Sequence, residues 1–231
     1  MVKLYMMELG YKEEDINKIL NHQSIKRILD KTLLLHIERI FYFFLDKGYT
    51  KEQIIQMTKH TPSLYSCSAE SIEHKYKELL SLGYTKEDII YITRIAPVIF
   101  TYNSEKIKEK MNLMIKLGYT KQEVLKMTVK FPGIYSASKD KIIDKIKYFQ
   151  KINLDKIFLK DAKQLIQSIE LTHARYEFLK EQTIEINDKN YKTLFYEENQ
   201  FKNKFKISKE ELLEKYNYEE YLERKEKSKT I

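Results

Sequence analysis

The stretch Leu82-Gly83-Tyr84-Thr85-Lys86-Glu87-Asp88-Ile89-Ile90, followed by Pro97, decides the fold of this chain because it recurs. Its Gly-Tyr core stands four times, as Leu9-Gly10-Tyr11, Lys47-Gly48-Tyr49, Leu82-Gly83-Tyr84 and Leu117-Gly118-Tyr119. The glycines are 38, 35 and 35 residues apart, and Pro62, Pro97 and Pro132 each follow a glycine at the same distance. Self-similarity at such a period is the signature of a solenoid, in which each repeat buries its apolar face against its neighbours.

Each repeat is predicted to contain two helices separated by a proline-led turn. Gly83 suits a helix C-terminus, where the left-handed conformation costs little only for glycine. Pro97 ends the first helix because it lacks an amide proton, and Val98-Ile99-Phe100 predicts a short 3₁₀ turn. Polar caps are expected at Thr50, Thr85 and Thr120 for the first helices, two of them in capping boxes with Gln53 and Glu123, and at Ser68, Asn103 and Ser138 for the second.

The ends of the array depart from this pattern, as terminal repeats do. Ser24 stands in the proline position of the first unit. A fifth unit is predicted to begin at Asn153, in the glycine position, with Gln167 in place of proline and a shortened second helix at about 174–181.

The last fifth of the chain is expected to be a capping segment. Residues 184–207 show no pattern that assigns a structure. A capping box at Ser208 predicts a helix over about 208–224, and Lys225 to Ile231 are expected to fray. We therefore divide the chain into repeats over 1–182 and a C-terminal segment over 183–231.

The repeat resembles that of the mitochondrial transcription termination factor (mTERF) family. The best matches are 82–90 with 97–100, and 117–135; the segment His173-Ala174-Arg175-Tyr176-Glu177-Phe178-Leu179 resembles a phrase near the end of that family. The resemblance covers roughly residues 9–182. It implies an all-α helical-repeat solenoid with a left-handed superhelix. It also implies binding of double-stranded DNA or of RNA along a basic face, with a role in regulating gene expression such as transcription.

The charge of the chain favours an anionic partner. Lys and Arg outnumber Asp and Glu by 42 to 34, a net charge of +8, and residues 46–150 account for +6 of it. Of the basic residues 37 are lysines, which supply affinity for phosphate with little sequence information. Lys-rich faces are also ordinary solubilising surface, so charge alone leaves the partner open.

Basic residues that recur at one repeat position are the candidate ligand contacts. One row lies beside the apolar spine of the second helices: Lys75, Lys110, Lys145 and Arg175. A second set lies near the end of the first helices, where helix stability alone also explains a cation: Lys59, Arg94 and Lys130. A third row begins the first helices: Lys51, Lys86, Lys121 and Lys156. The recurring aromatic residues of the Gly-Tyr phrase and of the turn fit the core better than base stacking.

No catalytic, metal or cofactor site is expected. The five histidines have no metal-ligand spacing, the glycines end repeats instead of forming a phosphate loop, and Cys67 stands alone. We expect a monomeric, non-enzymatic protein without a membrane span. The N-terminus shows no signal or transit peptide, which favours a bacterial-type relative in the cytoplasm. The alternative function is a protein-interaction solenoid that binds an acidic or helical partner.

Overall fold

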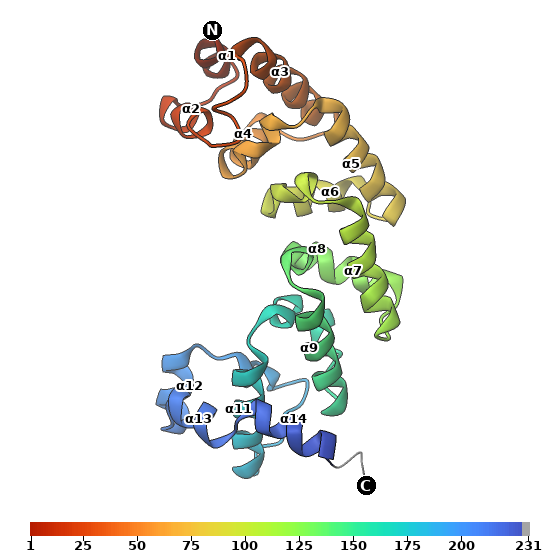
Figure 1. The fold of residues 1–231 in the computed structure, drawn as a ribbon, viewed down its shortest axis with the longest axis vertical. Coiled ribbons are helices and arrows are strands. Elements are labelled where there is room, and N and C mark those ends of the chain that lie inside the picture. Colours follow the sequence, from red (N-terminus) through yellow and green to blue (C-terminus); the bar gives the residue numbers. More distant parts are fainter. Residues whose placement is uncertain (228–231) are drawn as a thin grey trace. The chain divides into compact units, whose positions relative to one another are not determined.

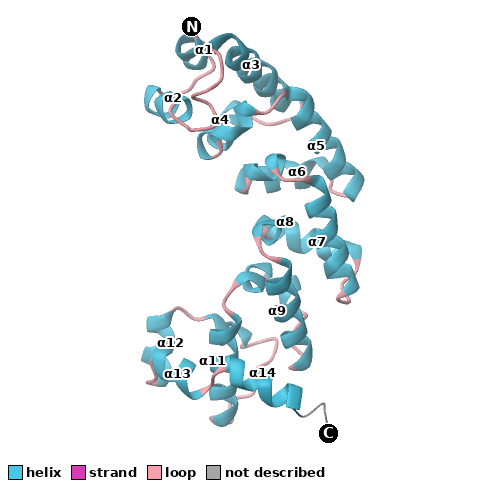
Figure 2. Cartoon of the chain, viewed as in Figure 1, coloured by secondary structure: helices cyan, strands magenta, loops and turns pink. Residues whose placement is uncertain are grey.

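The computed structural model describes residues 1–227, and within them every regular element is an α-helix or a 3₁₀ turn (Figures 1 and 2). The chain forms two compact units, Met1–Ser136 and Ala137–Ile231. Among residues 1–227, no helix has both the length and the apolar character needed to cross a membrane. The predicted all-α helical-repeat fold is confirmed.

The first unit contains the regular repeats, whose helices form two rows. The first helices of successive repeats pack on one another in the order α2, α4, α6, α8, and the second helices in the order α1, α3, α5, α7 (Figure 1). The elements of this unit are α1 Val2–Glu8, α2 Glu13–Leu20, α3 Asp30–Asp46, α4 Lys51–His60, η1 Pro62–Ser66, α5 Ala69–Leu82, α6 Lys86–Ile95, η2 Pro97–Thr101, α7 Ser104–Lys116, α8 Lys121–Lys130 and η3 Pro132–Ser136.

The predicted start and stop residues set the helix boundaries. Thr50, Thr85 and Thr120 cap α4, α6 and α8, and each takes part in a complete capping box. Each of the three prolines is the first residue of a 3₁₀ turn. Gly83 has φ +107°, and a side chain there would also meet Leu125 Cδ1 of α8 at 3.2 Å. Glycine is therefore needed both for its conformation and for the close approach of the next repeat.

The repeated tyrosine ties each repeat to the next. The threonine near the end of each first helix donates its hydroxyl proton to the carbonyl four residues earlier, and so accepts from the tyrosine of the preceding repeat. The Oη–Oγ1 distances are 2.7 Å for Tyr11–Thr58, 2.7 Å for Tyr49–Thr93 and 2.5 Å for Tyr84–Thr128. These tyrosines are buried, which confirms that they belong to the core.

The second unit begins with the second helix of the fourth repeat and continues with a fifth repeat, whose shortening was predicted in the wrong helix. Asn153 does occupy the glycine position, with φ 57°. The turn begins at Ala162, however, so Ala162 and not Gln167 replaces the proline. The first helix, α10 Ile157–Lys160, is the short one, and the second, α11 Ile169–Glu181, has full length; between them lies η4 Ala162–Ile166, and α9 Lys139–Lys151 precedes them.

The segment 184–207, which the sequence left unassigned, continues the repeat pattern in reduced form. Thr183 has a positive φ of 58° in the glycine position after α11. No first helix follows within this segment; instead come a 3₁₀ turn, η5 Tyr191–Phe195, and a short helix, α12 Glu198–Phe205. A sixth, degenerate repeat therefore closes the array.

The C-terminal helix predicted over 208–224 is two helices. The capping box at Ser208 opens α13 Lys209–Lys215 as predicted. Asn217 then accepts hydrogen bonds from the amides of Glu219 and Glu220 and so starts a new helix, α14 Tyr218–Lys227. Of the residues expected to fray, 225–227 belong to α14, and 228–231 lie outside the described residues.

Candidate nucleic-acid interface

The row on the second helices, which we call the second-helix row, is aligned as predicted but buried. Each of its members stands seven residues after the N-cap of its helix. The exposed fractions are 6% for Lys75, 8% for Lys110, 1% for Lys145 and 3% for Arg175. Because so little of these side chains can be reached by a ligand, our proposal for the interface rests on other residues.

The cations of the second-helix row bind the turn and cap of the following repeat. Lys110 donates to the carbonyl of Tyr135 in η3, and Lys75 to the hydroxyl of Ser104 at the start of α7. His36 holds the same position in α3, with Nδ1 3.1 Å from the carbonyl oxygen of Tyr65. The row therefore supplies hydrogen bonds for carbonyl and hydroxyl groups where one repeat meets the next.

The second unit shows the same arrangement. Lys145 Nζ donates to the Ser168 carbonyl at 3.0 Å and the Thr172 hydroxyl at 2.7 Å, and burial lowers its pKa to about 7. Arg175 donates to the carbonyls of Leu194 and Tyr196 at 3.0 and 2.7 Å. Burial also lowers the pKa of Arg175. The sequence held a sign of this burial: Lys145 follows Ile142 by three residues and precedes Phe149 by four, which is a core-facing spacing.

The Lys59 side chain is half-buried. Its Nζ is 2.8 Å from Oδ1 of Asp15 in α2, and the Asp15 side chain is only 5% exposed. The hydrogen bond to Asp15 is the main reason that the pKa of Lys59 is raised. This lysine is committed to an ion pair between the first two repeats.

Two members of the row that begins the first helices, Lys86 and Lys121, lie near the C-terminal ends of neighbouring second helices. A side chain at Gly83, just after α5, would meet Lys121 Cε at 3.4 Å. The pKa of Asp46, at the end of α3, is lowered mainly by the hydrogen bond from Lys47. The positive charge of Lys86 contributes to the same shift. These lysines lie at the N-termini of their own helices but near the C-terminal ends of neighbouring ones, where cations are favourable.

The remaining candidates lie on an exposed surface of α6 and α8. Arg94 and Lys130 are exposed, as predicted for residues near the end of a first helix. Lys126, which the sequence analysis did not single out, is exposed one turn before Lys130, and Tyr91 of α6 is 48% exposed. We call these four residues the first-helix surface; α6 and α8 pack side by side (Figure 2).

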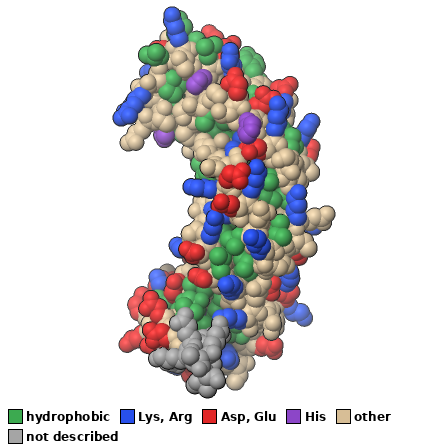
Figure 3. Space-filling model, turned by 45° about the vertical axis from the view of Figure 1, so that its right-hand side comes forward, with side chains coloured by type: hydrophobic (Ala, Val, Ile, Leu, Met, Phe, Trp, Pro, Cys, Tyr) green, Lys and Arg blue, Asp and Glu red, His purple; other side chains and the backbone are tan. Residues whose placement is uncertain are grey.

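The stretch of sequence that contains these cations holds no carboxylate in any regular repeat. Residues 53–69, 89–104 and 124–139 contain no Asp or Glu. The acids of the repeats fall instead in the first turns of the helices, where the helix dipole favours them, and along the second helices. Figure 3 shows acidic and basic side chains intermingled on the face that it presents. The acid-free stretch is the sequence signal that would have located the first-helix surface.

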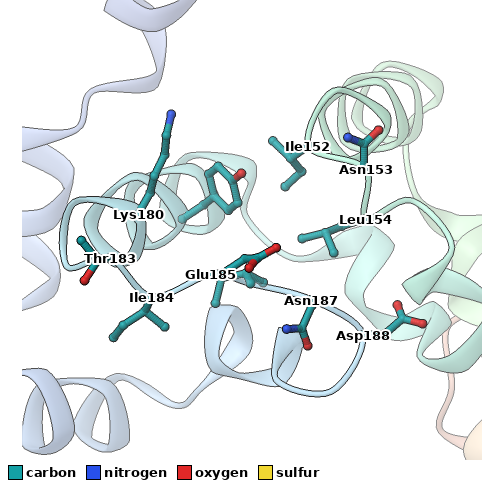
Figure 4. Close-up of a pocket in the computed structure, with 11 residues that line it drawn as sticks. Ile152, Asn153, Leu154, Lys180, Thr183, Ile184, Glu185, Asn187 and Asp188 are labelled. Atoms are coloured by element: carbon teal, nitrogen blue, oxygen red, sulfur yellow. The ribbon is translucent and has the colours of Figure 1, made fainter.

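A pocket of about 680 Å³ lies in the second unit, between the α9–α10 connection and the loop after α11 (Figure 4). Lys180, Glu185 and Asp188 line it, and Asp188 is paired with Lys160 at 2.7 Å. Its charges are mixed and do not form a phosphate site. Within the described part of the chain, no three His, Cys, Asp or Glu side chains are grouped as metal ligands.

The two rows of helices, the 3₁₀ turn between them and the glycine that ends each unit define a helical-repeat solenoid. The family model named mTERF matches residues 1–157, and the chain belongs to the mTERF family. The match ends within the fifth repeat, so the segment 173–179 lies beyond it. A search of curated proteins found no match to this chain. Membership in this family indicates nucleic-acid binding as the class of function.

Proposed function

We propose that the protein binds double-stranded DNA or RNA through the first-helix surface, with Arg94, Lys126 and Lys130 contacting phosphates. The observation that carries this proposal is the exposure of Arg94, Lys126 and Lys130 on two helices that pack side by side, in stretches, 89–104 and 124–139, that contribute no Asp or Glu of their own. Exposed cations can contact a phosphate backbone and release its counterions. Family membership supports the same ligand class. Such binding would serve the regulation of gene expression.

The composition of the surface favours backbone contacts over base recognition. Arg94 is its one arginine, and arginine is the residue that reads guanine through a bidentate contact. Lysines supply affinity that varies little with sequence. Tyr91 offers an exposed ring on which a base of a single strand could stack. We therefore expect weak sequence preference, and the preferred polymer is left to measurement.

The test is fluorescence-anisotropy binding to duplex DNA and to single-stranded RNA between about 50 and 200 mM salt. The variant Arg94→Gln/Lys126→Gln/Lys130→Gln is compared with a control that loses the same charge on the second helices, Lys106→Gln/Lys116→Gln/Lys147→Gln. The slope of log K against log salt should become shallower by about two to three for the first variant, and by less than one for the control.

Two results would contradict the proposal. Binding to neither polymer at about 50 mM salt would remove nucleic acid as the ligand and leave the protein-interaction solenoid as the function. Equal losses in the two variants would show that net charge, and not this surface, governs binding.

A further inference from the structure

Two exposed side chains of α6 are large and hydrophobic at positions where the neighbouring first helices carry polar ones. Tyr91 is 48% exposed and Ile95 is 55% exposed, and their spacing of four residues places both on one side of the helix. The helices that pack on either side of α6 are α4 and α8. The same two repeat positions, 8 and 12 residues after the glycine, hold polar or charged residues there: Gln56 and His60 in α4, and Lys126 and Lys130 in α8.

The core of the repeat does not require this pair. The residues of α6 that face the core are Ile89, Ile92 and Thr93, and all three are fully buried. Among residues 1–227, the Tyr91 ring contacts no other aromatic ring and its hydroxyl forms no hydrogen bond. Single exposed apolar side chains are ordinary, and several others lie elsewhere on this unit. What sets Tyr91 and Ile95 apart is that they lie among the cations of the first-helix surface.

The repeat places these hydrophobic side chains level with the cations of α8. Tyr91 occupies the repeat position of Lys126, and Ile95 that of Lys130. Because α6 and α8 pack side by side, with axes about 8–10 Å apart for packed helices, a nucleotide whose base rests on the Tyr91 ring has a phosphate within reach of Arg94 or Lys126.

The carboxylates of α6 limit where an anionic strand can lie. Glu87 and Asp88 both stand in the first turn of the helix, one turn before Tyr91. Arg94 and Ile95 follow Tyr91, in the half of the helix that holds no acid. The site for a strand is therefore the C-terminal half of α6 together with the facing part of α8.

A hydrophobic ring among cations gains contact from an unpaired base and not from a duplex. In a duplex each base is stacked on its neighbours, and taking one out of the stack costs free energy. The outside of a duplex presents phosphates, which reward cations but not an aromatic or aliphatic side chain. In a single strand the faces of the bases are free to stack on an aromatic side chain, whatever the sequence.

We propose that the first-helix surface prefers single-stranded nucleic acid, with one unpaired base stacked on Tyr91 and packed beside Ile95. This inference rests on the proposed function and names the form of polymer that the surface selects. Arg94, Lys126 and Lys130 hold the phosphates that flank this base. RNA and DNA strands share the unpaired base and the phosphate, so both enter the test.

Affinity should be measured by fluorescence anisotropy at about 100 mM salt for an RNA strand and a DNA strand of about 16 nucleotides, and for the duplex of the same length. The unmodified protein should bind a single strand more tightly than the duplex. Tyr91→Ala should lower the ratio of single-strand to duplex affinity about 5- to 100-fold. Tyr91→Phe should keep this ratio, because it keeps the ring. The salt slope of Tyr91→Ala should not change, since no charge is lost.

A direct measurement of stacking is possible because the chain contains no tryptophan. Tyr91→Trp introduces a single fluorophore at the site, and its emission should be quenched when a single strand saturates the protein. The duplex should quench it much less. The matched control Tyr42→Trp, at a 55% exposed position of α3 in the other row of helices, should show little change with any polymer. Stronger quenching by RNA than by DNA, or the reverse, identifies the preferred strand.

The outcomes separate this inference from the proposed function. An affinity ratio that Tyr91→Ala leaves unchanged, or a Tyr91→Trp emission that does not change at saturation, would overturn the stacking of a base on Tyr91. The phosphate contacts would still stand if Arg94→Gln/Lys126→Gln/Lys130→Gln made the salt slope shallower. Binding to no polymer at about 50 mM salt would remove both.

Discussion

Two sets of basic residues lie along the helices of this protein, and they differ in what surrounds them. The second-helix row lies against the turn of the next repeat and donates to its carbonyl and hydroxyl oxygens. Arg94, Lys126 and Lys130 on the first helices are exposed. Only the second-helix row keeps one repeat position: its three lysines each follow the glycine of their repeat by 27 residues, whereas Arg94, Lys126 and Lys130 follow theirs by 11, 8 and 12. Recurrence in a solenoid can therefore reflect the contact between repeats and not a ligand.

The largest difference between the sets should appear when Arg175 is truncated. Arg175→Ala removes two charge-assisted hydrogen bonds to the Leu194 and Tyr196 carbonyls, and the contact of the guanidinium with the Phe201 ring at 4.6 Å. Because the carbonyls are left without this donor, we expect a loss of about 3–4 kcal/mol in urea unfolding followed by circular dichroism. The matched exposed variant Arg94→Ala should change stability by less than about 0.5 kcal/mol. Similar losses for the two arginines would refute the distinction.

The pH dependence of stability gives a second, slightly smaller contrast. The pKa of Lys145 is lowered to about 7 in the folded protein, against 10.5 for a free lysine. Between these values the unfolded chain holds a proton that the folded chain has lost, so this lysine makes stability rise with pH by up to about 1.4 kcal/mol per unit. The cost of burying the charged lysine therefore lowers the free energy of unfolding in full below about pH 7, and it disappears toward pH 10, where the unfolded chain also loses the proton.

The measurement compares the unmodified protein with Lys145→Met between about pH 7 and 9.5, below the range in which free tyrosines ionise. The stability of the unmodified protein should rise relative to this variant across the interval. Lys147→Met, at an exposed position of the same helix, should follow the unmodified protein. A constant difference between Lys145→Met and the unmodified protein would show that Lys145 is charged in the fold throughout.

The features predicted correctly from the sequence are those that depend on a few neighbouring residues. A glycine that accepts positive φ, a threonine that caps a helix and a proline that starts a turn act locally, and Gly83, Thr85 and Pro97 all do so as predicted. The fifth repeat was aligned wrongly because Ala162 stands where proline would have marked the turn. Without that marker, local pattern did not show which of the two helices had been shortened.

Burial of the second-helix row depends on the next repeat and was missed for that reason. Lys75 lies three residues after Ile72 and four before Leu79, so its own helix already directs it toward the core. Two partners make burial of this lysine tolerable: the carboxylate of Glu78 in its own helix, at 3.0 Å, and the hydroxyl of Ser104, which stands 29 residues later. The first is apparent from the i, i+3 spacing in one repeat, whereas the second comes from the next repeat and is not.

Lys59 is an intermediate case, because we expect its substitution to lower the free energy of unfolding by about 1–2 kcal/mol. Lys59→Gln leaves the Asp15 carboxylate, with a 5% exposed side chain, without its cation, so unfolding should occur at lower urea concentration. In an Asp15→Asn background the same substitution should cost less than about 0.5 kcal/mol, because no buried charge remains. An equal cost in both backgrounds would show that Lys59 stabilises the fold without its ion pair to Asp15.

The smallest expected effect concerns Lys121, which is exposed yet lies against the residue that ends α5. If its cation serves the C-terminal end of α5, Lys121→Gln should lower stability by about 0.3–0.5 kcal/mol, and the loss should shrink at about 1 M salt. Lys126→Gln, on the outward side of the same helix, should cost nothing measurable at either salt concentration. If the two variants have equal stability at low salt, then Lys121 makes no structural contribution, and the row that begins the first helices should be added to the surface tested for nucleic-acid binding.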